Sequence, residues 1–408
     1  MNNNGTDGPR RARHLRLVAL SLLPWLALDA AAGVREQAKV MHDRLTGVPP
    51  SEAVLLDMSA DLAAGDYRSA AYTAMDNDAF YSVTLKNWVT PWTNRDQDVF
   101  RPLNDYTATV IGAVRDEIDF RRILWDDLIY VADPALSLPP YSAANNAQYE
   151  ALESGGVPLS TGLVSRSQAA VTGLPPEATA GVMTSRGAAK AFFIAGTNRA
   201  MFRFTLLNHL CNDMEQVQDT SRPPDRIRQD ISRSPGGDSR VFLNNCIGCH
   251  SGMDPMAQAF AYYNYAYDAD NDPDGDSGTI TYNDVGQLDP DTGTRVNAKY
   301  QINSANFPYG YVTPDDHWDN YWREGPNAVL AWDGGTGSGA GAKSLGQELA
   351  NSGAFAQCQV KKVFAAVCLR EPGDSSDRDY VSSATSSFRT DYNVKQVFAE
   401  TANYCKGD

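Results

Sequence analysis

The residues with the clearest chemical potential are Cys246, Cys249 and His250, which form a Cys-x-x-Cys-His sequence. Two cysteines three positions apart lie about one helical turn from each other, so both sulfurs can reach the two vinyl groups of one porphyrin. A histidine directly after the second cysteine is then delivered under the iron as its proximal ligand. This spacing is the attachment pattern of a c-type haem and predicts one covalently bound haem per chain.

Three other uses of these residues are open from the pattern alone. A zinc site would need a fourth ligand, and the sequence contains no second Cys-x-x-Cys pair. A dithiol redox pair or a structural disulfide between Cys246 and Cys249 would leave His250 without a role. Six cysteines and five histidines in 408 residues would produce the pattern by chance in about one chain in a thousand, which favours haem attachment.

The sixth coordination position of the iron has no ligand that the sequence identifies, because no methionine follows Met256. The methionines close to the motif are too near His250 in sequence to fold over the opposite face of the haem. The distal candidates are His317 and Met183, followed by His209, for which a place in the core is the more common role. An open or water-bound sixth position is an equal alternative.

A second concentration of chemically active residues is the acidic segment 268–291. Three alternate aspartates and the glycine after them match positions 1, 3, 5 and 6 of an EF-hand-type calcium loop. The match then fails, because position 12 is Thr281 rather than glutamate and no flanking helices are evident. Calcium binding in a looser loop and a plain solvated acidic loop are both open. The candidate calcium ligands are Asp270, Asp272, Asp274 and Asp276.

The start of the chain has the pattern of an export signal. Four arginines between positions 10 and 16 precede an apolar run from Leu17 to Leu28, and three alanines end at Ala32. The run is about half as long as a membrane crossing requires, so we expect a signal peptide over residues 1–32, with an uncleaved anchor as the alternative. We therefore expect the protein in the periplasm or on the cell surface of a Gram-negative bacterium.

The remaining chain is strongly acidic. Removal of residues 1–32 takes away four arginines and two aspartates, which moves the formal net charge from −15 to −17. This charge argues against nucleic acid and anionic lipid as partners, and it fits a basic redox partner protein. No later stretch is apolar enough to cross a membrane, so no membrane span is expected in the mature chain.

Four cysteines lie outside the motif, and an even number in an exported protein suggests two disulfides. If residues 358–368 form a helix, Cys358 and Cys368 lie about 15 Å apart along its axis and cannot bond to each other. Of the three pairings that four cysteines allow, we favour Cys211–Cys358 with Cys368–Cys405. Free buried thiols are the alternative.

Apolar residues at helical spacing predict a mainly α fold, with a helical N-terminal subdomain and a cytochrome-c-like helical haem module with long loops. About 375 mature residues exceed one comfortable hydrophobic core, so two subdomains are expected. The expected regions are a helical region over 33–133, a loop-rich segment over 134–179, a helical block and linker over 180–240, and a haem c module over 241–408 that ends in helices.

The motif and three further blocks resemble the large exported cytochrome-c-like proteins of the planctomycete and myxobacterial type, whose haem-binding module lies towards the C-terminus. The resemblance implies a mostly helical exported haem protein and says little about activity. The acidic insert 268–291 departs from the family pattern. The blocks that carry the likeness are Arg44 to Pro50, Ala180 to Gly187 with Leu206 to Cys211, Cys246 to Pro255 with its Met-Asp-Pro ending, and Leu345 to Arg370.

Three functions are compatible with these features. We expect an exported monohaem c-type cytochrome that transfers electrons, which requires a strong sixth ligand. In a haem-dependent redox enzyme with an open sixth position, His317 or Arg186 would act on bound peroxide or oxygen. The single motif lacks the second haem that dihaem peroxidases use. In a structural or binding module, haem and calcium would mainly stabilise the fold.

Overall fold

The computed structural model describes residues 33–228, 239–301 and 310–407. Over these residues the chain is mainly helical, and its strands form three two-stranded antiparallel sheets, so the expected mainly α fold is confirmed. The signal peptide expected over residues 1–32 and part of the linker before the haem motif lie outside the described residues.

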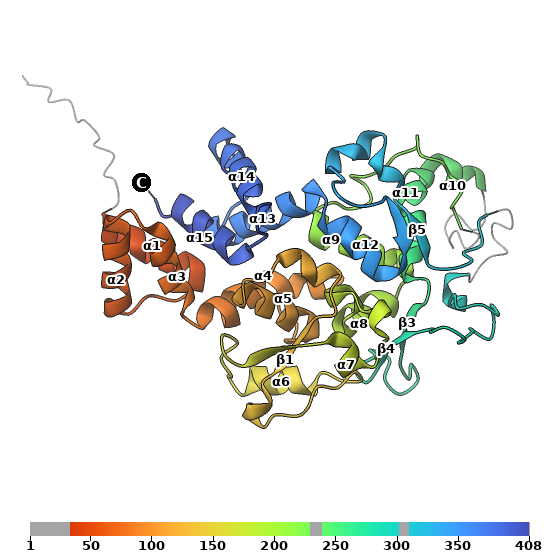
Figure 1. Ribbon diagram of the computed structural model, residues 1–408, viewed down its shortest axis with the longest axis horizontal. Coiled ribbons are helices and arrows are strands. Elements are labelled where there is room, and N and C mark those ends of the chain that lie inside the picture. The colour runs from red at the N-terminus through yellow and green to blue at the C-terminus, as the bar shows by residue number, and fades with distance from the viewer. Residues whose placement is uncertain (1–32, 229–238, 302–309, 408) are drawn as a thin grey trace, which may run out of the picture.

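Three N-terminal helices pack on one another and on the C-terminal helices, so the two ends of the described chain meet (Figure 1). Ser51 and Asp66 begin the second and third helices, because each side chain accepts a hydrogen bond from a backbone N–H of the first turn. The helices are α1 (Val34–Thr46), α2 (Glu52–Ala63), α3 (Tyr67–Met75), α13 (Gly353–Cys368), α14 (Ser375–Phe388) and α15 (Val394–Tyr404).

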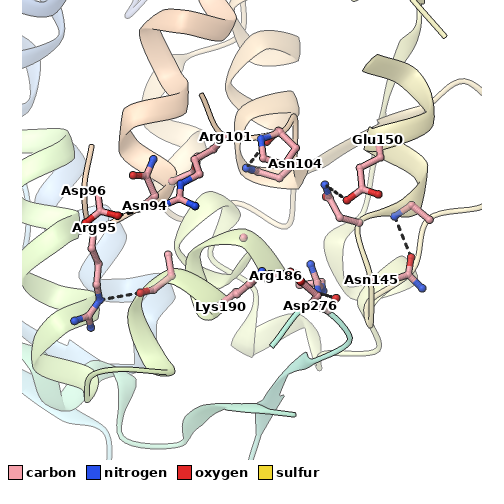
Figure 2. A pocket seen from close by; sticks show the side chains of 16 residues that line it. Asn94, Arg95, Asp96, Arg101, Asn104, Asn145, Glu150, Arg186, Lys190 and Asp276 are labelled. Atoms are coloured by element: carbon pink, nitrogen blue, oxygen red, sulfur yellow. Dashed lines mark hydrogen bonds and ion pairs between the residues drawn. The ribbon is translucent and has the colours of Figure 1, made fainter. Parts of the chain in front are cut away.

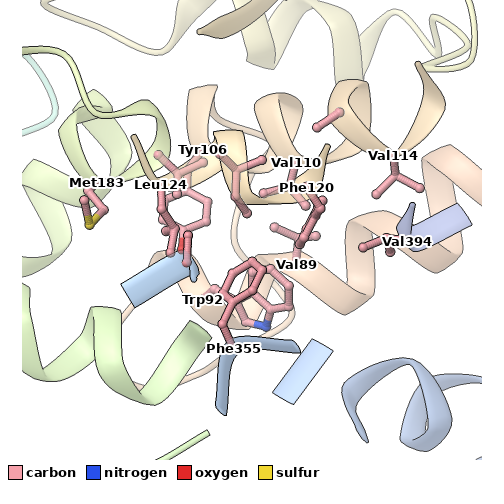
Figure 3. Packing of buried hydrophobic residues seen from close by; sticks show 14 of the residues in the cluster. Val89, Trp92, Tyr106, Val110, Val114, Phe120, Leu124, Met183, Phe355 and Val394 are labelled. Atoms are coloured by element: carbon pink, nitrogen blue, oxygen red, sulfur yellow. The ribbon is translucent and has the colours of Figure 1, made fainter. Parts of the chain in front are cut away.

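Helix α5 (Asp105–Arg115) runs through the centre, and its residues from Asp105 to Val114 are all buried. Figure 3 shows its residues Tyr106 and Val110 among aromatic side chains of several elements. Most buried hydrophobic residues between Ala38 and Ala402 form one connected cluster, so the N-terminal and C-terminal regions share a core. The neighbouring elements are η1 (Phe80–Leu85), α4 (Lys86–Val89), η2 (Thr90–Thr93) and η3 (Phe120–Leu124).

The segment 134–179 is more ordered than its composition predicts. Strand β2 (Leu163–Arg166) pairs antiparallel with β1 (Ile129–Ala132), and two short helices flank it. Side chains support this strand pair, since the Tyr149 hydroxyl donates to the Tyr130 carbonyl and Gln148 accepts from the Ala132 N–H. The prediction of a long loop was therefore wrong in part. The other elements are η4 (Pro134–Leu136), α6 (Ala147–Ser154), α7 (Gln168–Thr172) and η5 (Pro176–Ala178).

The helical block expected after residue 180 is present as η6 (Gly181–Thr184), α8 (Arg186–Phe193) and α9 (Asn198–Leu210). The buried carboxylate of Asp105 in α5 caps the N-terminus of α8. It accepts hydrogen bonds from the backbone N–H groups of Arg186 and Gly187 at 2.7 and 2.9 Å. Helix α9 packs against both α13 and the helix that carries the haem motif.

The Cys-x-x-Cys-His sequence begins at the junction of α10 (Ser239–Asn245) and α11 (Ile247–Ala257) and continues into α11, at the end of the molecule away from α1–α3 (Figure 1). After it, strands β3 (Tyr263–Ala266) and β4 (Thr279–Tyr282) form a hairpin that frames the first half of the acidic segment. The remaining elements are η7 (Gln258–Phe260), η8 (Ala298–Tyr300), β5 (His317–Asp319), η10 (Tyr321–Arg323), η11 (Pro326–Leu330), β6 (Ser338–Ala340) and α12 (Gly341–Ala350).

One disulfide joins the C-terminal helices to the rest of the fold, and a second links two of these helices to each other. Cys211 at the end of α9 bonds to Cys358 of α13, and Cys368 at the end of α13 bonds to Cys405. The favoured pairing is therefore confirmed. The helix over residues 353–368 separates Cys358 from Cys368, which excludes one of the two other pairings. In the described part of the chain, no helix combines the length and apolar character needed to cross a membrane.

Candidate haem site

The Cys-x-x-Cys-His sequence occupies the junction of α10 and α11. The backbone N–H of Cys246 donates to the Phe242 carbonyl at 2.8 Å, and the N–H groups of Cys249 and His250 both donate to the Cys246 carbonyl at 3.2 Å. The motif therefore forms the first turn of α11, which places the two cysteines one helical turn apart. Both side chains are partly exposed thiols outside any disulfide.

The Cys249 thiol is half-buried and lies near other electronegative groups. Burial raises the pKa of Cys249, and the nearby Cys246, Glu215 and Asp213 raise it further. The thiol also lies 3.4 Å from the Met214 carbonyl. A reactive redox cysteine needs a lowered pKa, because the thiolate is the nucleophile. The raised pKa applies to Cys249, so the dithiol alternative stays open beside haem attachment.

The imidazole of His250 is held by a buried carboxylate one turn further along α11. His250 Nδ1 lies 3.0 Å from Asp254 Oδ1, and Arg199 of α9 binds the same carboxylate through Nε and Nη2 at 2.7 and 2.8 Å. Burial alone would raise the pKa of Asp254, but the charge of Arg199 and the hydrogen bonds from Arg199 and His250 hold it well below its usual range. The ionised carboxylate only accepts hydrogen bonds, so Nδ1 carries the proton.

This arrangement fits a proximal haem ligand. With the proton on Nδ1, the other ring nitrogen, Nε2, keeps its lone pair for a metal. The Phe242 ring lies 5.2 Å from the His250 ring, and Phe242 packs with Ile227 in a small hydrophobic cluster against Cys246 and Ile247. The residues present therefore supply two attachment sulfurs, one oriented nitrogen and an apolar neighbour for a porphyrin.

Several contacts fix α11 in the protein. The Ser251 hydroxyl donates to the Asp219 carbonyl at 2.7 Å, and the Asp219 N–H donates to the Gly248 carbonyl at 2.8 Å. At the far end of the helix, the side-chain amide of Asn198 donates to the Ala257 carbonyl at 2.8 Å. Hydrogen bonds near the start and at the end of α11 therefore fix the helix that carries the motif.

The distal candidates lie in three different environments. Met183 is 2% exposed and packs in the central core near Leu124 (Figure 3). The side chain of His317 on β5 is 48% exposed and lies 3.7 Å from Asp319. His209 is buried, its Nε2 lies 2.7 Å from the Tyr106 hydroxyl, and burial lowers its pKa well below the usual value. Across residues 33–228, 239–301 and 310–407, no hydrogen bond, ion pair or ring contact joins any of the three to His250.

The aspartates of the candidate calcium loop do not converge. Asp272 accepts hydrogen bonds from the backbone N–H groups of Asp276 and Ser277 at 2.9 and 2.6 Å, and these bonds lower its pKa. The Asp276 carboxylate pairs with Lys190. Among the described residues, no three His, Cys, Asp or Glu side chains form a group that could hold a metal ion. Calcium binding at this loop stays a prediction, and in the present geometry the Asp272 carboxylate caps a turn.

Arg186, the other distal candidate of the enzyme alternative, anchors the same loop. Its Nε donates to the Gly278 carbonyl at 2.8 Å, and its Nη2 donates to the carbonyls of Gly275 and Asp276. Figure 2 shows Arg186 beside Asp276 at the edge of a cavity of about 700 Å³ between α8 and the segment 93–104. The guanidinium of Arg186 is buried and engaged with backbone carbonyls, and its action on a haem-bound ligand stays a prediction.

Comparison of the chain with protein-family models, curated protein sequences and solved structures gave no match. The resemblance to exported cytochrome-c-like proteins therefore stays a prediction, and the case for haem depends on the geometry of this chain. Sequence reasoning missed the pairing of His250 with Asp254. The spacing could have revealed it, because residues four apart on a helix lie on the same face.

Proposed function

We propose that this chain is an exported monohaem c-type cytochrome that transfers electrons. One observation carries the proposal: four of the six cysteines close two disulfides, while Cys246 and Cys249 are left as neighbouring thiols directly before His250. Because the other four cysteines are oxidised to disulfides, we infer that the two remaining thiols serve a different purpose. Covalent attachment of haem uses both thiols and the following histidine together.

Each residue has a defined part in holding the cofactor. The sulfurs of Cys246 and Cys249 would form the two thioether bonds, and His250 Nε2 would ligate the iron. Asp254 would keep the imidazole in the required orientation through its hydrogen bond to Nδ1. Arg199 would hold the Asp254 carboxylate in place through two charged hydrogen bonds. When bound, the haem supplies a centre that gains and loses one electron.

Two features support the proposed location and partner. Disulfides form and persist in oxidising compartments, so the two observed here support an exported protein of the periplasm or the cell surface. Without residues 1–32 the net charge moves from −15 to −17, because four arginines and two aspartates are lost. Such a surface attracts a basic redox protein electrostatically and repels nucleic acid.

The test is a visible spectrum of the purified, export-matured protein, after a denaturing gel has shown covalently bound haem. If the ferrous haem is low-spin and does not bind carbon monoxide, both axial positions are filled and electron transfer is supported. Absence of the haem stain from the mature protein would overturn the proposal at its first step.

A haem-dependent redox enzyme is the second candidate. The observation that favours it is the carboxylate on His250, because a more basic proximal imidazole gives more electron density to the iron. Ready binding of carbon monoxide to the ferrous haem would show an accessible sixth position. Peroxide and oxygen would then be the substrates to assay.

A further inference from the structure

The carboxylate of Asp254 lies at the meeting point of three segments. Oδ1 receives His250 Nδ1 at 3.0 Å and Arg199 Nε at 2.7 Å, and Oδ2 receives Arg199 Nη2 at 2.8 Å and the Arg228 backbone N–H at 3.4 Å. The Asp254 side chain is fully buried, and that of Arg199 is 14% exposed. A histidine on α11 is therefore coupled through one carboxylate to an arginine on α9.

Burial makes this coupling strong. A buried carboxylate without a partner is costly, so its two-point contact with Arg199 keeps it charged in the interior. A charged acceptor draws the Nδ1 proton towards itself, which raises the electron density on the rest of the imidazole. A more basic imidazole stabilises ferric iron more than ferrous iron. Arg199 competes for the same charge, so it limits how far the proton is drawn.

We propose that Asp254 is a positioning residue that fixes the proximal imidazole and holds the haem iron at a lower reduction potential than a neutral partner would. The inference rests on the proposed attachment of haem at Cys246, Cys249 and His250. Arg199 also contributes, since it holds the Asp254 carboxylate in place and moderates the effect of that carboxylate on His250.

The test uses the haem-loaded, export-matured protein and measures the midpoint potential by spectroscopic redox titration. In Asp254→Asn a neutral amide replaces the carboxylate. We expect the ferric–ferrous equilibrium to move about tenfold towards ferrous iron, which is about +59 mV for a one-electron couple. Asp254→Glu keeps the charge and should restore most of the lower potential. An unchanged potential in Asp254→Asn, with haem still attached, would overturn the inference and leave the proposed function intact.

A second variant covers the case in which Asp254→Asn does not fold. Arg199→Lys keeps a positive charge but loses the two-point contact, so the carboxylate acts more strongly on His250 and the potential should fall. If this potential does not change, the inference is wrong. The matched control is Asp377→Asn, which removes another buried carboxylate bound by an arginine, Arg370, at a site in α14. It should leave the midpoint potential unchanged, since α14 packs on α13 and α15.

Discussion

Gly252 of α11 lies directly against the indole of Trp322, with no space for a side chain between them. A Cβ atom built on Gly252 would come within 1.9 Å of Trp322 Nε1 and 2.2 Å of Cε2. Trp322 is fully buried, so it has little freedom to move aside. The haem-motif helix therefore packs against its neighbour by a close approach two residues after His250.

Gly252→Ala should destabilise the protein by about 1–3 kcal/mol, because an extra methyl group in a well-packed site forces neighbouring atoms to shift. The matched control is Gly248→Ala on the same helix, where the nearest atom to the new Cβ, Gln218 Cβ, is 3.4 Å away. We expect the control to be neutral or slightly stabilising, since alanine favours helices over glycine. Thermal unfolding distinguishes the two variants, and equal losses would contradict the packing argument.

Replacement of both Cys246 and Cys249 by alanine should abolish the haem-stained band on a denaturing gel, because no thioether bond can form. Each single alanine variant retains one attachment point and should keep a reduced band. The control is Cys368→Ser with Cys405→Ser, which removes the disulfide at the C-terminal end of α13. Its soluble fraction should stain as the wild type does. A band that persists in the double alanine variant would exclude covalent attachment at the motif.

Met183→Ala should lower the free energy of unfolding by about 2–5 kcal/mol, the usual range for truncation of a buried methionine. We expect the visible spectrum to stay unchanged, because the described contacts of Met183 lie in the core, where its Cε is near Gly346. His317→Ala, at a half-exposed position, should change stability by less than about 0.5 kcal/mol. A spectral change in either variant would identify that residue as an iron ligand.

The stability that Asp377 provides should depend on pH. The hydrogen bonds from Arg370 and from the Gly373 N–H hold the pKa of Asp377 well below its usual range, against the effect of burial, and the Tyr404 hydroxyl also lowers it. A carboxyl group with a lowered folded-state pKa contributes stability above its unfolded pKa of about 3.9, and this is lost as pH falls through the folded-state value. Asp377→Asn should therefore melt at a lower temperature than wild type at pH 7, and the difference should shrink as pH falls towards 2. A constant difference would contradict the assignment.

Local patterns in the sequence were sufficient for several parts of the fold. The apolar spacing before residue 368 predicted a helix, and this helix excluded one disulfide pairing by distance alone. The motif likewise predicted its own geometry, because cysteines three apart on a helix are neighbours in any fold.

Other parts depend on contacts between distant segments. Strand β2 is stabilised by pairing with β1, which side chains of α6 hold in turn, and the proline- and glycine-rich sequence around β2 does not indicate this order. Arg199 reaches Asp254 only because α9 packs against α11. A single sequence does not report which helices are neighbours. It can place Asp254 on the same helix face as His250, but it cannot predict that Arg199 binds Asp254.

The connectivity of the disulfides has a consequence for maturation. Cys211 precedes every other cysteine, and its partner Cys358 lies beyond both haem-motif cysteines. A chain that enters an oxidising compartment N-terminus first thus exposes Cys211 together with Cys246 and Cys249 before the correct partner arrives. Thiols in an unfolded chain exchange according to access, so these three compete to form wrong bridges. Under the proposed function, delivery of haem would remove two of the competitors, and the cofactor would act as a safeguard of oxidative folding.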